Sequence, residues 1–465
     1  MSLGIGQIFS RGLDGLNVTQ RGLAVTSNNI ANMNTKGYAR QQIIIGSNAT
    51  SGGGGASVLG VTSIVSPFVE LQLFNSSNSF GFVDGRRQSV AQVEEMFNES
   101  KNDGLGKAMN DLFNSFSALS NDAASMTNRQ SVRDAAARVA SKFNSLYRQL
   151  NQMRSDISAE VTGRIDRINS LSEQIANLNG QIQGNPNPES VLDLKAQRLS
   201  VLRELSEEVN VSYYEQGDIM QVSLAGSISM VNGTLAGSLS VTNDLNVGGE
   251  MTVNMLLPGT ATGALDVTDH VTGGRLGGNL LERNTTLNDR LAELDELAFN
   301  LAQRVNAIHS TGYSLGGTTG ISFFEPIASQ DGAALNIKLD ALIESDLGNI
   351  AAAQEDPAVS GVADNRIALQ LHELQNTQTM SGSSQTFAQF YQGIVGSVGT
   401  AANAVNRDYQ TQANLLNQLE IQRESVSGVN LDEEGANIIR FQKAFQASSR
   451  LISIADELME SILNI

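Results

Sequence analysis

The N-terminal end of the chain predicts an amphipathic helix over residues 8–31. Large apolar residues recur there every seven positions among polar neighbours, as they do on the contact face of a coiled coil. These residues are Phe9, Leu16, Leu23 and Ile30. The helix is expected to end before Gly37, because glycine readily adopts the left-handed conformation that follows many helices. Three asparagines near this end, Asn28, Asn29 and Asn32, are expected to bond the backbone of the following loop or of a neighbouring subunit.

The C-terminal end, residues 431–464, has the most regular heptad pattern in the chain. One row is Ile438, Phe445, Ile452 and Met459, and the second row is Phe441, Ser448, Ala455 and Ile462. Asn430 is placed to cap this helix, with Glu433 at the third position closing a capping box. We expect this helix to bind the N-terminal helix, because nothing in its own segment covers its apolar face.

Between these ends, segments whose apolar residues recur with a helical period are followed by a segment whose apolar residues recur with the period of a strand. Residues 85–183 follow a helical period, the Gly- and Pro-containing segment 184–188 interrupts it, and residues 189–209 predict an antiparallel helix. Apolar residues then alternate with period two from about residue 210. The helical period returns near residue 282, which indicates an outward, separable β-rich domain inserted into a helical core.

The sequence therefore predicts an α+β multidomain protein. Its core is a long α-helical bundle or coiled coil formed by the N- and C-terminal segments. The expected divisions are 1–38 (N-terminal assembly helix), 39–84 (short strands and a flexible Gly-rich loop), 85–209 (helical core), 210–281 (β-rich outer domain), 282–312 (return to the core), 313–364 (mixed loop and β segment), 365–427 (helical core) and 428–465 (C-terminal assembly helix).

The charge and composition of the chain limit the classes of partner that it can bind. The net charge is -18, from 30 Lys and Arg against 48 Asp and Glu. This charge opposes binding to nucleic acid and to anionic lipid. No apolar run is long enough to cross a membrane, so no membrane insertion is expected, and the first residues lack the features of a cleaved secretory signal. The chain contains no Cys, which removes disulfides and thiolate metal sites from consideration.

Candidate catalytic and metal-binding patterns are weak. The three His residues stand in unrelated segments without the spacing of a zinc helix. The glycines at 52–55 lack a phosphate-loop pattern and predict a flexible loop. Asp432, Glu433 and Glu434 suit the first turn of a helix, where acids oppose the helix dipole, better than a glycosidase pair. We therefore expect no enzyme activity and no cofactor or metal.

Two segments resemble a known family. Residues 23–38, LAVTSNNIANMNTKGY, resemble the N-terminal signature of the flagellar axial proteins, which comprise rod, hook and hook-associated subunits. The continuation through Arg40 and Gln41, and the segment SVSGVNLDEE at 425–434, resemble the hook-associated branch. The segment GGRLGG at 273–278 is also similar to that branch, where it returns the chain from the outer domain to the core.

The resemblance implies a structural subunit at the hook–filament junction, exported by the flagellar type III apparatus without a cleaved signal and located in the extracellular flagellum. Its implied partners are further copies of itself in a ring, the hook protein, a second junction protein and a cytoplasmic export chaperone that binds the C-terminal helix. A hook or rod subunit remains one alternative, and an extracellular hydrolase or adhesin on a flagellar scaffold is another. The expected assembly surface includes the heptad residues of the N-terminal helix, which are Phe9, Leu16, Leu23 and Ile30. From the C-terminal helix it includes Ile438, Phe441, Phe445, Ile452, Met459 and Ile462. From the N-terminal motif it includes Asn28, Asn29, Asn32, Gly37 and Tyr38.

Overall fold

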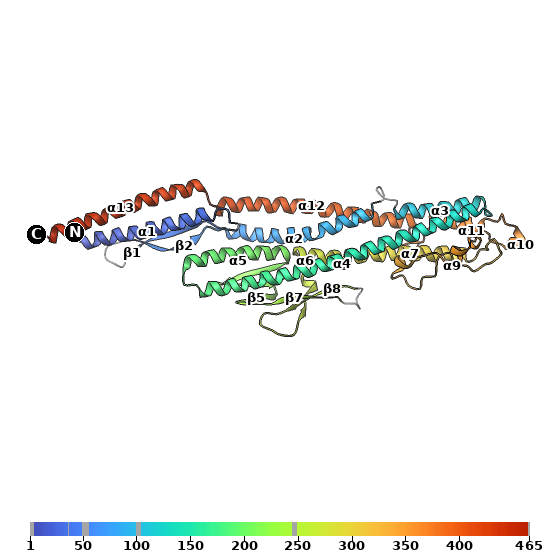
Figure 1. Cartoon of the computed structure of the whole chain (residues 1–465), viewed down its shortest axis with the longest axis horizontal. Helices are drawn as coiled ribbons and strands as arrows, with labels where there is room; N and C mark the ends of the chain where they lie inside the picture. Colours follow the sequence, from blue (N-terminus) through green and yellow to red (C-terminus); the bar gives the residue numbers. More distant parts are fainter. Residues whose placement is uncertain (1–3, 36, 49–54, 99–103, 244–248, 464–465) are drawn as a thin grey trace.

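Long helices form an elongated rod in this computed structural model, and the two termini lie at the same end (Figure 1). The structure describes residues 4–35, 37–48, 55–98, 104–243 and 249–463. At that end, α1 (Ile5–Ala31) packs antiparallel to α13 (Leu431–Leu463). We refer to these two helices as the terminal pair. The expected helices at both ends of the chain are therefore present.

A β-hairpin lies against α1 in the terminal region. Strand β1 (Gln41–Asn48) pairs antiparallel with β2 (Gly55–Ser63), and Leu59 forms a bulge in β2. The flexible loop expected around the glycines at 52–55 thus gives way to a strand from Gly55 onward, and residues 49–54 lie outside the described residues. Pairing with β1 along the whole of Gly55–Ser63 overrides the flexibility that the glycine content suggested.

The shaft of the rod consists of helices that run along its length. Helix α2 begins at Pro67, although residues 39–84 were expected to hold strands and a loop. The overlooked signal is proline at the first helical position, where its missing N–H leaves no bond unmade. The main shaft helices are α2 (Pro67–Met96), α3 (Leu105–Asn121), α4 (Met126–Gly184), α5 (Pro188–Glu208), α7 (Leu287–His309) and α12 (Phe387–Ser427). As expected, α4 and α5 are antiparallel neighbours joined at the Gly- and Pro-containing turn.

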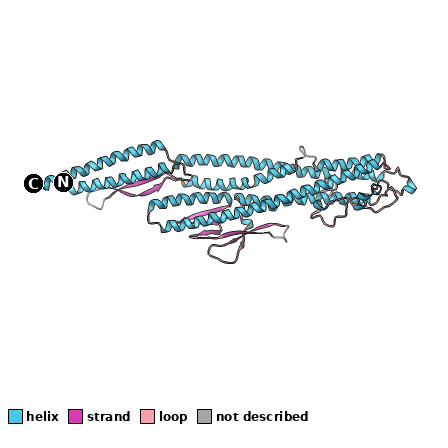
Figure 2. Ribbon diagram, in the orientation of Figure 1, coloured by secondary structure: helices cyan, strands magenta, loops and turns pink. Residues whose placement is uncertain are grey.

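Two small antiparallel sheets lie along α4 (Figure 2). The first has the order β3 (Val211–Gln216), β4 (Ile219–Leu224), β5 (Ile228–Asn232) and β6 (Leu235–Ala236). The second has the order β7 (Ser238–Asn243), β8 (Met251–Leu256) and β9 (Leu265–Asp266).

These sheets share their core with the shaft, which argues against a freely separable outer domain. Buried residues of β4 and β8, such as Val222 and Val253, belong to the same apolar core as Ile168 of α4. Asn179 of α4 also donates its side-chain amide to the Met220 carbonyl, at 2.8 Å, and accepts from the Met220 N–H at 3.1 Å. The sheets therefore cover an apolar face that α4 would otherwise expose.

The chain re-enters the shaft earlier than residue 282. Helix α6 (Gly274–Leu281) begins inside the segment that resembles the family, and a π-helical turn at Glu282–Thr286 leads into α7. Arg275 anchors α6 to two other helices, because its guanidinium bonds Asp84 of α2 at 2.8 Å and Glu208 of α5 at 3.1 Å. The alternating pattern ends before this point, so the boundary expected at residue 281 was several residues late.

The far end of the rod carries short elements and irregular chain. They are α8 (Ala333–Asn336), α9 (Ala341–Ser345), α10 (Pro357–Ser360) and α11 (Arg366–Glu373), with short 3-10 turns between them. Buried Arg129, at the start of α4, donates to the carbonyls of Ala123 and Ile350 and so ties this end together. The terminal pair lies at the opposite end of the rod (Figure 1).

Candidate assembly interface

Small residues of α1 form the contact line between the terminal helices. Gly12 and Gly22 are buried, and a Cβ added at Gly12 would lie 2.6 Å from the Ile452 side chain. A Cβ added at Gly22 would lie 2.5 Å from the Phe441 ring. The glycines therefore allow large side chains of α13 to sit directly on the α1 backbone.

The large heptad residues of α1 do not form the centre of this contact. Phe9, Leu16, Leu23 and Ile30 are half-buried, whereas Gly12, Val18, Thr19, Gly22, Val25, Thr26 and Asn29 are buried. The buried set has its own seven-residue spacings, such as 12, 19 and 26. Apolar size misled the interpretation here, because the closest helix contacts need small residues on one of the two partners.

Both heptad rows of α13 contact α1, but the second row is more deeply buried than the first. Phe441 and Ala455 are buried, and Ser448 lies nearest to Gly15. In the first row Ile438, Phe445 and Ile452 are half-buried, while Met459 is 42% exposed. The side chain of Ile462 lies outside the described residues.

Asn29 of the N-terminal motif fastens α1 to the hairpin. Its side-chain amide donates to the Gln41 carbonyl at 2.9 Å and accepts from the Gln41 N–H at 2.9 Å. The Tyr38 hydroxyl donates to the same Asn29 oxygen at 2.9 Å. Burial, with Asp193 and Glu434 nearby, raises the pKa of Tyr38 above its usual value. The expected bonding of Asn29 to the segment that follows the helix is thus present.

The other two asparagines bond within the helix end. Asn32 donates to the Asn28 side-chain oxygen at 2.8 Å and to the Asn28 carbonyl at 3.0 Å. Gly37 does have a positive φ of 85°, but α1 has already ended at Ala31. Gly37 therefore turns the loop rather than ending the helix. Its closeness to Ser200, 3.2 Å from an added Cβ, places this turn against α5.

Arg40 joins the two chain ends by ion pairs. Its guanidinium bonds Glu434 at 2.6 Å and Glu433 at 2.5 Å. Asn430 caps α13 as expected, since its side-chain oxygen accepts from the Asp432 N–H at 2.9 Å. Glu433 binds Arg40 instead of closing the expected capping box. A long-range opposite charge has displaced the local hydrogen bond.

A buried charge cluster that the sequence did not indicate fixes the terminal region to the shaft. Glu70 of α2 accepts from Arg423 of α12 at 3.2 Å and from Arg203 of α5. Arg423 also donates to the Tyr38 carbonyl at 2.9 Å. Burial lowers the pKa of Arg203, and Glu70 opposes that effect. These residues are hundreds of positions apart, so no local pattern could have revealed the cluster.

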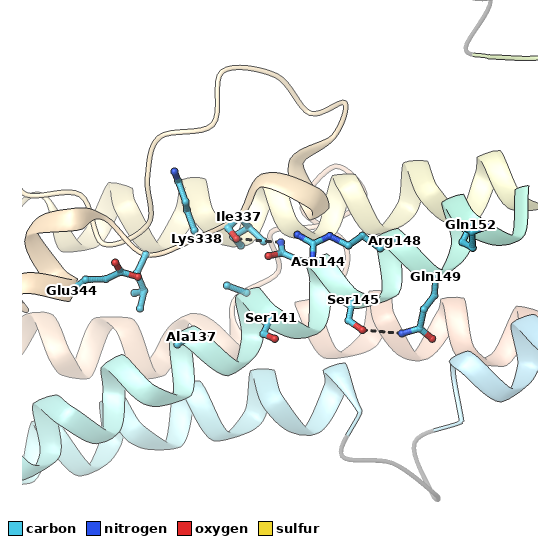
Figure 3. Close-up of a pocket in the computed structure, with 12 residues that line it drawn as sticks. Ala137, Ser141, Asn144, Ser145, Arg148, Gln149, Gln152, Ile337, Lys338 and Glu344 are labelled. Atoms are coloured by element: carbon cyan, nitrogen blue, oxygen red, sulfur yellow. Dashed lines mark hydrogen bonds between the residues drawn. The ribbon is translucent and has the colours of Figure 1, made fainter. Parts of the chain in front are cut away.

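A cavity lies elsewhere, on the N-terminal half of α4 (Figure 3). It has a volume of about 680 Å³ and runs between α4 and residues 337–344. Its lining includes one carboxylate, Glu344, and no histidine. Asn144 in its wall donates to the Ala334 and Leu335 carbonyls at 2.9 Å, which holds the neighbouring segment in place.

The described residues contain no cluster of three or more His, Asp or Glu side chains that could bind a metal ion. Within the same part of the chain, no helix combines the length and the apolar character needed to span a membrane.

Residues 90–324 match the family model described as the flagellar hook-associated protein FlgK helical domain. The chain belongs to this family. Its two ends match models named for flagellar rod proteins, with residues 12–38 matching the flagella basal body rod protein and residues 422–465 the C-terminal part of the FlgEFG proteins. Both end matches fall within or overlap the terminal pair. The hook-associated branch suggested by the N- and C-terminal motifs is thus confirmed.

Individual relatives agree with the family. The flagellar hook-associated protein 1 of Bacillus subtilis is 29% identical, over 97% of this chain and 96% of the relative. The protein of the same name from Escherichia coli is 25% identical, over 98% and 99%. The fold resembles the flagellar hook junction protein FlgK from Burkholderia pseudomallei, with a TM-score of 0.69 and 19% identity over 77% of this chain and 100% of that one.

Proposed function

We propose that this chain is the subunit that joins the flagellar hook to the filament, and that it acts as a building block rather than as an enzyme. The observation that carries the proposal is the terminal pair, which closes on itself through a glycine seam and still exposes apolar side chains. The family, whose members are structural proteins of the flagellum, supports the same role.

The uncovered side of the terminal pair offers a surface for further subunits. Exposed apolar side chains on α13 lie three to four residues apart, at Leu451, Ile454 and Leu458, and Met459 adjoins them. Leu13 of α1 is 42% exposed as well. Such a stripe is unfavourable in water and is typical of a surface that another helix covers. We infer that neighbouring copies in a ring, the hook protein and the second junction protein cover it.

The exposed apolar side chains of α13 also offer a binding surface to a partner before the subunit is assembled. Before assembly, α13 would expose apolar residues on two sides, which a cytoplasmic export chaperone could cover. Export through the flagellar type III apparatus and final placement in the extracellular flagellum belong to the same proposal. The separateness of the terminal pair supports it, because the buried residues Val18, Val25, Phe441 and Ala455 lie outside the apolar core of the shaft.

The double substitution Phe441→Asp with Phe445→Asp tests this function. The carboxylate at position 441 would replace a buried ring that packs on Gly22, and the one at position 445 would replace a half-buried ring, which together cost several kcal/mol in the terminal pair. We expect unchanged thermal unfolding of the shaft and lost swimming when the variant complements a strain that lacks the junction protein.

A matched control places the same charge at the far end of the rod. Leu342, 53% exposed in α9, lies outside the terminal pair, so Leu342→Asp is expected to swim normally. Normal swimming of the double variant, or collapse of the whole monomer, would contradict the proposed role of α13.

A further inference from the structure

The outer edge of β1 is open along most of its length. Gln41 turns its N–H and its carbonyl away from β2, toward Asn29. Backbone groups of alternate residues face the same edge, so those of Ile43 and Ile45 face away from β2 as well. The bulge lies in β2, which leaves this alternation in β1 intact. No described residue outside the hairpin bonds the main chain of Ile43 or Ile45.

A groove follows this open edge. It has a volume of about 320 Å³, and its walls are β1 on one side and α13 on the other. Gly22 and Thr26 of α1 form its floor, and Phe441 belongs to the α13 wall. Because the floor is built from small residues, an extended strand placed here could pair with β1 and rest on α1.

The hairpin lacks the features that normally protect an open edge. Exposed strand edges usually carry charged residues or proline, which prevent pairing with other chains. Neither β1 nor β2 contains a charged residue or a proline. Ile44, Ile45 and Leu59 are instead 45%, 49% and 69% exposed.

We propose that a second copy of this chain adds a strand at the open edge of β1, and that the strand it adds is β2 of its own hairpin. Two copies that each carry a net charge of -18 repel one another, and the strands of the hairpin add no further charge where they would meet. The charged residues that line the groove are two arginines, Arg40 and Arg440, and Glu434, which pairs with Arg40. The hairpin supplies both halves of the contact, since β1 and β2 each have an outer edge.

A contact between two different edges is head-to-tail. Repeated around an axis, such contacts form a ring where the rotation between copies closes and an open helix where it does not. The hairpin would then provide a band of main-chain hydrogen bonds beside the helix contacts of the terminal pair. This inference rests on the proposed function, because it needs copies of the chain to lie side by side.

Disulfide trapping tests the contact directly, because the chain contains no Cys of its own. Chains with Ile44→Cys are co-expressed in a junction-null strain with chains that carry one Cys on the exposed side of β2, at Ala56, Leu59 or Thr62. Each chain has a single Cys, so every disulfide joins two copies. We expect an oxidised dimer for at least one pairing, and no dimer when the second Cys replaces Leu342 at the far end.

Several results would overturn the proposal. Swimming cells without a mixed dimer in any pairing would exclude the edge contact while leaving the junction function intact. Dominant dimers between two chains that both carry Ile44→Cys would show symmetric β1 pairing, and a disulfide to a protein of different mass would show another occupant. Failure of the unmodified chain to restore swimming would remove the junction function, and this inference with it.

A second variant separates pairing from folding. Ile45→Pro removes one N–H from the open edge, a position where proline is tolerated in strands. We expect the purified monomer to melt like the parent, and the mixed dimer band to be lost from cells. A retained dimer band would overturn the proposal.

Discussion

Single side chains make the connections that hold the terminal pair at a defined position on the rod. The side-chain amide of Asn29 makes the two hydrogen bonds that a neighbouring strand would make, because it bonds both the N–H and the carbonyl of Gln41. Arg40 and Arg423 then link the same loop to α13 and to α2. The motif that resembles the axial proteins is therefore a joint between helices in this structure.

Replacing Asn29 tests that joint. Asn29→Ala leaves the buried Gln41 main chain unpaired at two groups, each of which costs about 1–3 kcal/mol. We expect faster amide hydrogen exchange in β1 and at the end of α1, with unchanged exchange in α4. Asn34→Ala, at an exposed position in the same loop, is the control. Equal protection in the two variants would show that the amide contributes little.

A buried histidine at the far end predicts a dependence on pH. His309 accepts from the Ala351 N–H at 2.8 Å through Nε2, so its Nδ1–H donates to the Ile321 carbonyl, also at 2.8 Å. Burial lowers the pKa of His309 from 6.5 to about 4, and the charge of Arg129 acts in the same direction. The folded protein therefore holds this ring neutral.

Between pH 6.5 and 4 the unfolded state binds more protons at this position than the folded state, so folding stability falls as the pH falls. The full effect is about 3 kcal/mol. We expect the melting temperature of His309→Gln to fall less between pH 7 and pH 4.5 than the melting temperature of the parent. His270→Gln, at an exposed histidine, should behave like the parent. Parallel melting curves for all three proteins would contradict the neutral, buried ring.

At the scale of elements, the α1–α13 contact depends on the absence of side chains. A close helix crossing needs small residues on one partner, and α1 supplies them at Gly12 and Gly22 while α13 supplies Ile452 and Phe441. The glycines that allow this close contact destabilise helix α1, since each glycine in a helix interior costs roughly 0.5–1 kcal/mol relative to alanine.

Two glycines of the same helix separate these effects. Gly22→Ala would place a methyl group 2.5 Å from the Phe441 ring, so we expect the terminal helices to separate and swimming to decline. Gly6→Ala meets no atom within 4 Å and should only strengthen the helix. Circular dichroism and motility of the two variants provide the measurement. A Gly22→Ala variant that swims like the parent would show that the seam can relax.

At the scale of the whole molecule, the sheets and the shaft form one body. Deleting residues 211–281 would remove α6 and uncover apolar side chains of α4, including Ile168 and Ile175. Each uncovered large apolar side chain costs about 1.5–3 kcal/mol. We therefore expect a deletion closed by a Gly/Ser linker to aggregate or to melt far below the parent, as followed by calorimetry. A soluble protein with unchanged melting would restore the separable domain that the sequence suggested.

Local order along the chain was largely set by the sequence itself. The heptads at both ends, the Asn430 cap and the turn between α4 and α5 each depend on neighbours within a few residues, so their patterns could be interpreted without a structure. The same holds for the strand alternation after residue 210.

The tertiary structure alone decided which residues meet. Glu70 bonds two arginines that lie far from it in the chain. Glu433 binds the distant Arg40 instead of closing a capping box. Both sheets pack on α4, which also joins segments far apart in the sequence. The glycine seam belongs here as well, because a missing side chain leaves no apolar signal in the sequence. Periodicity reports which side of an element is apolar, whereas contact depends on how closely two backbones approach, and that distance is set only when the elements pack.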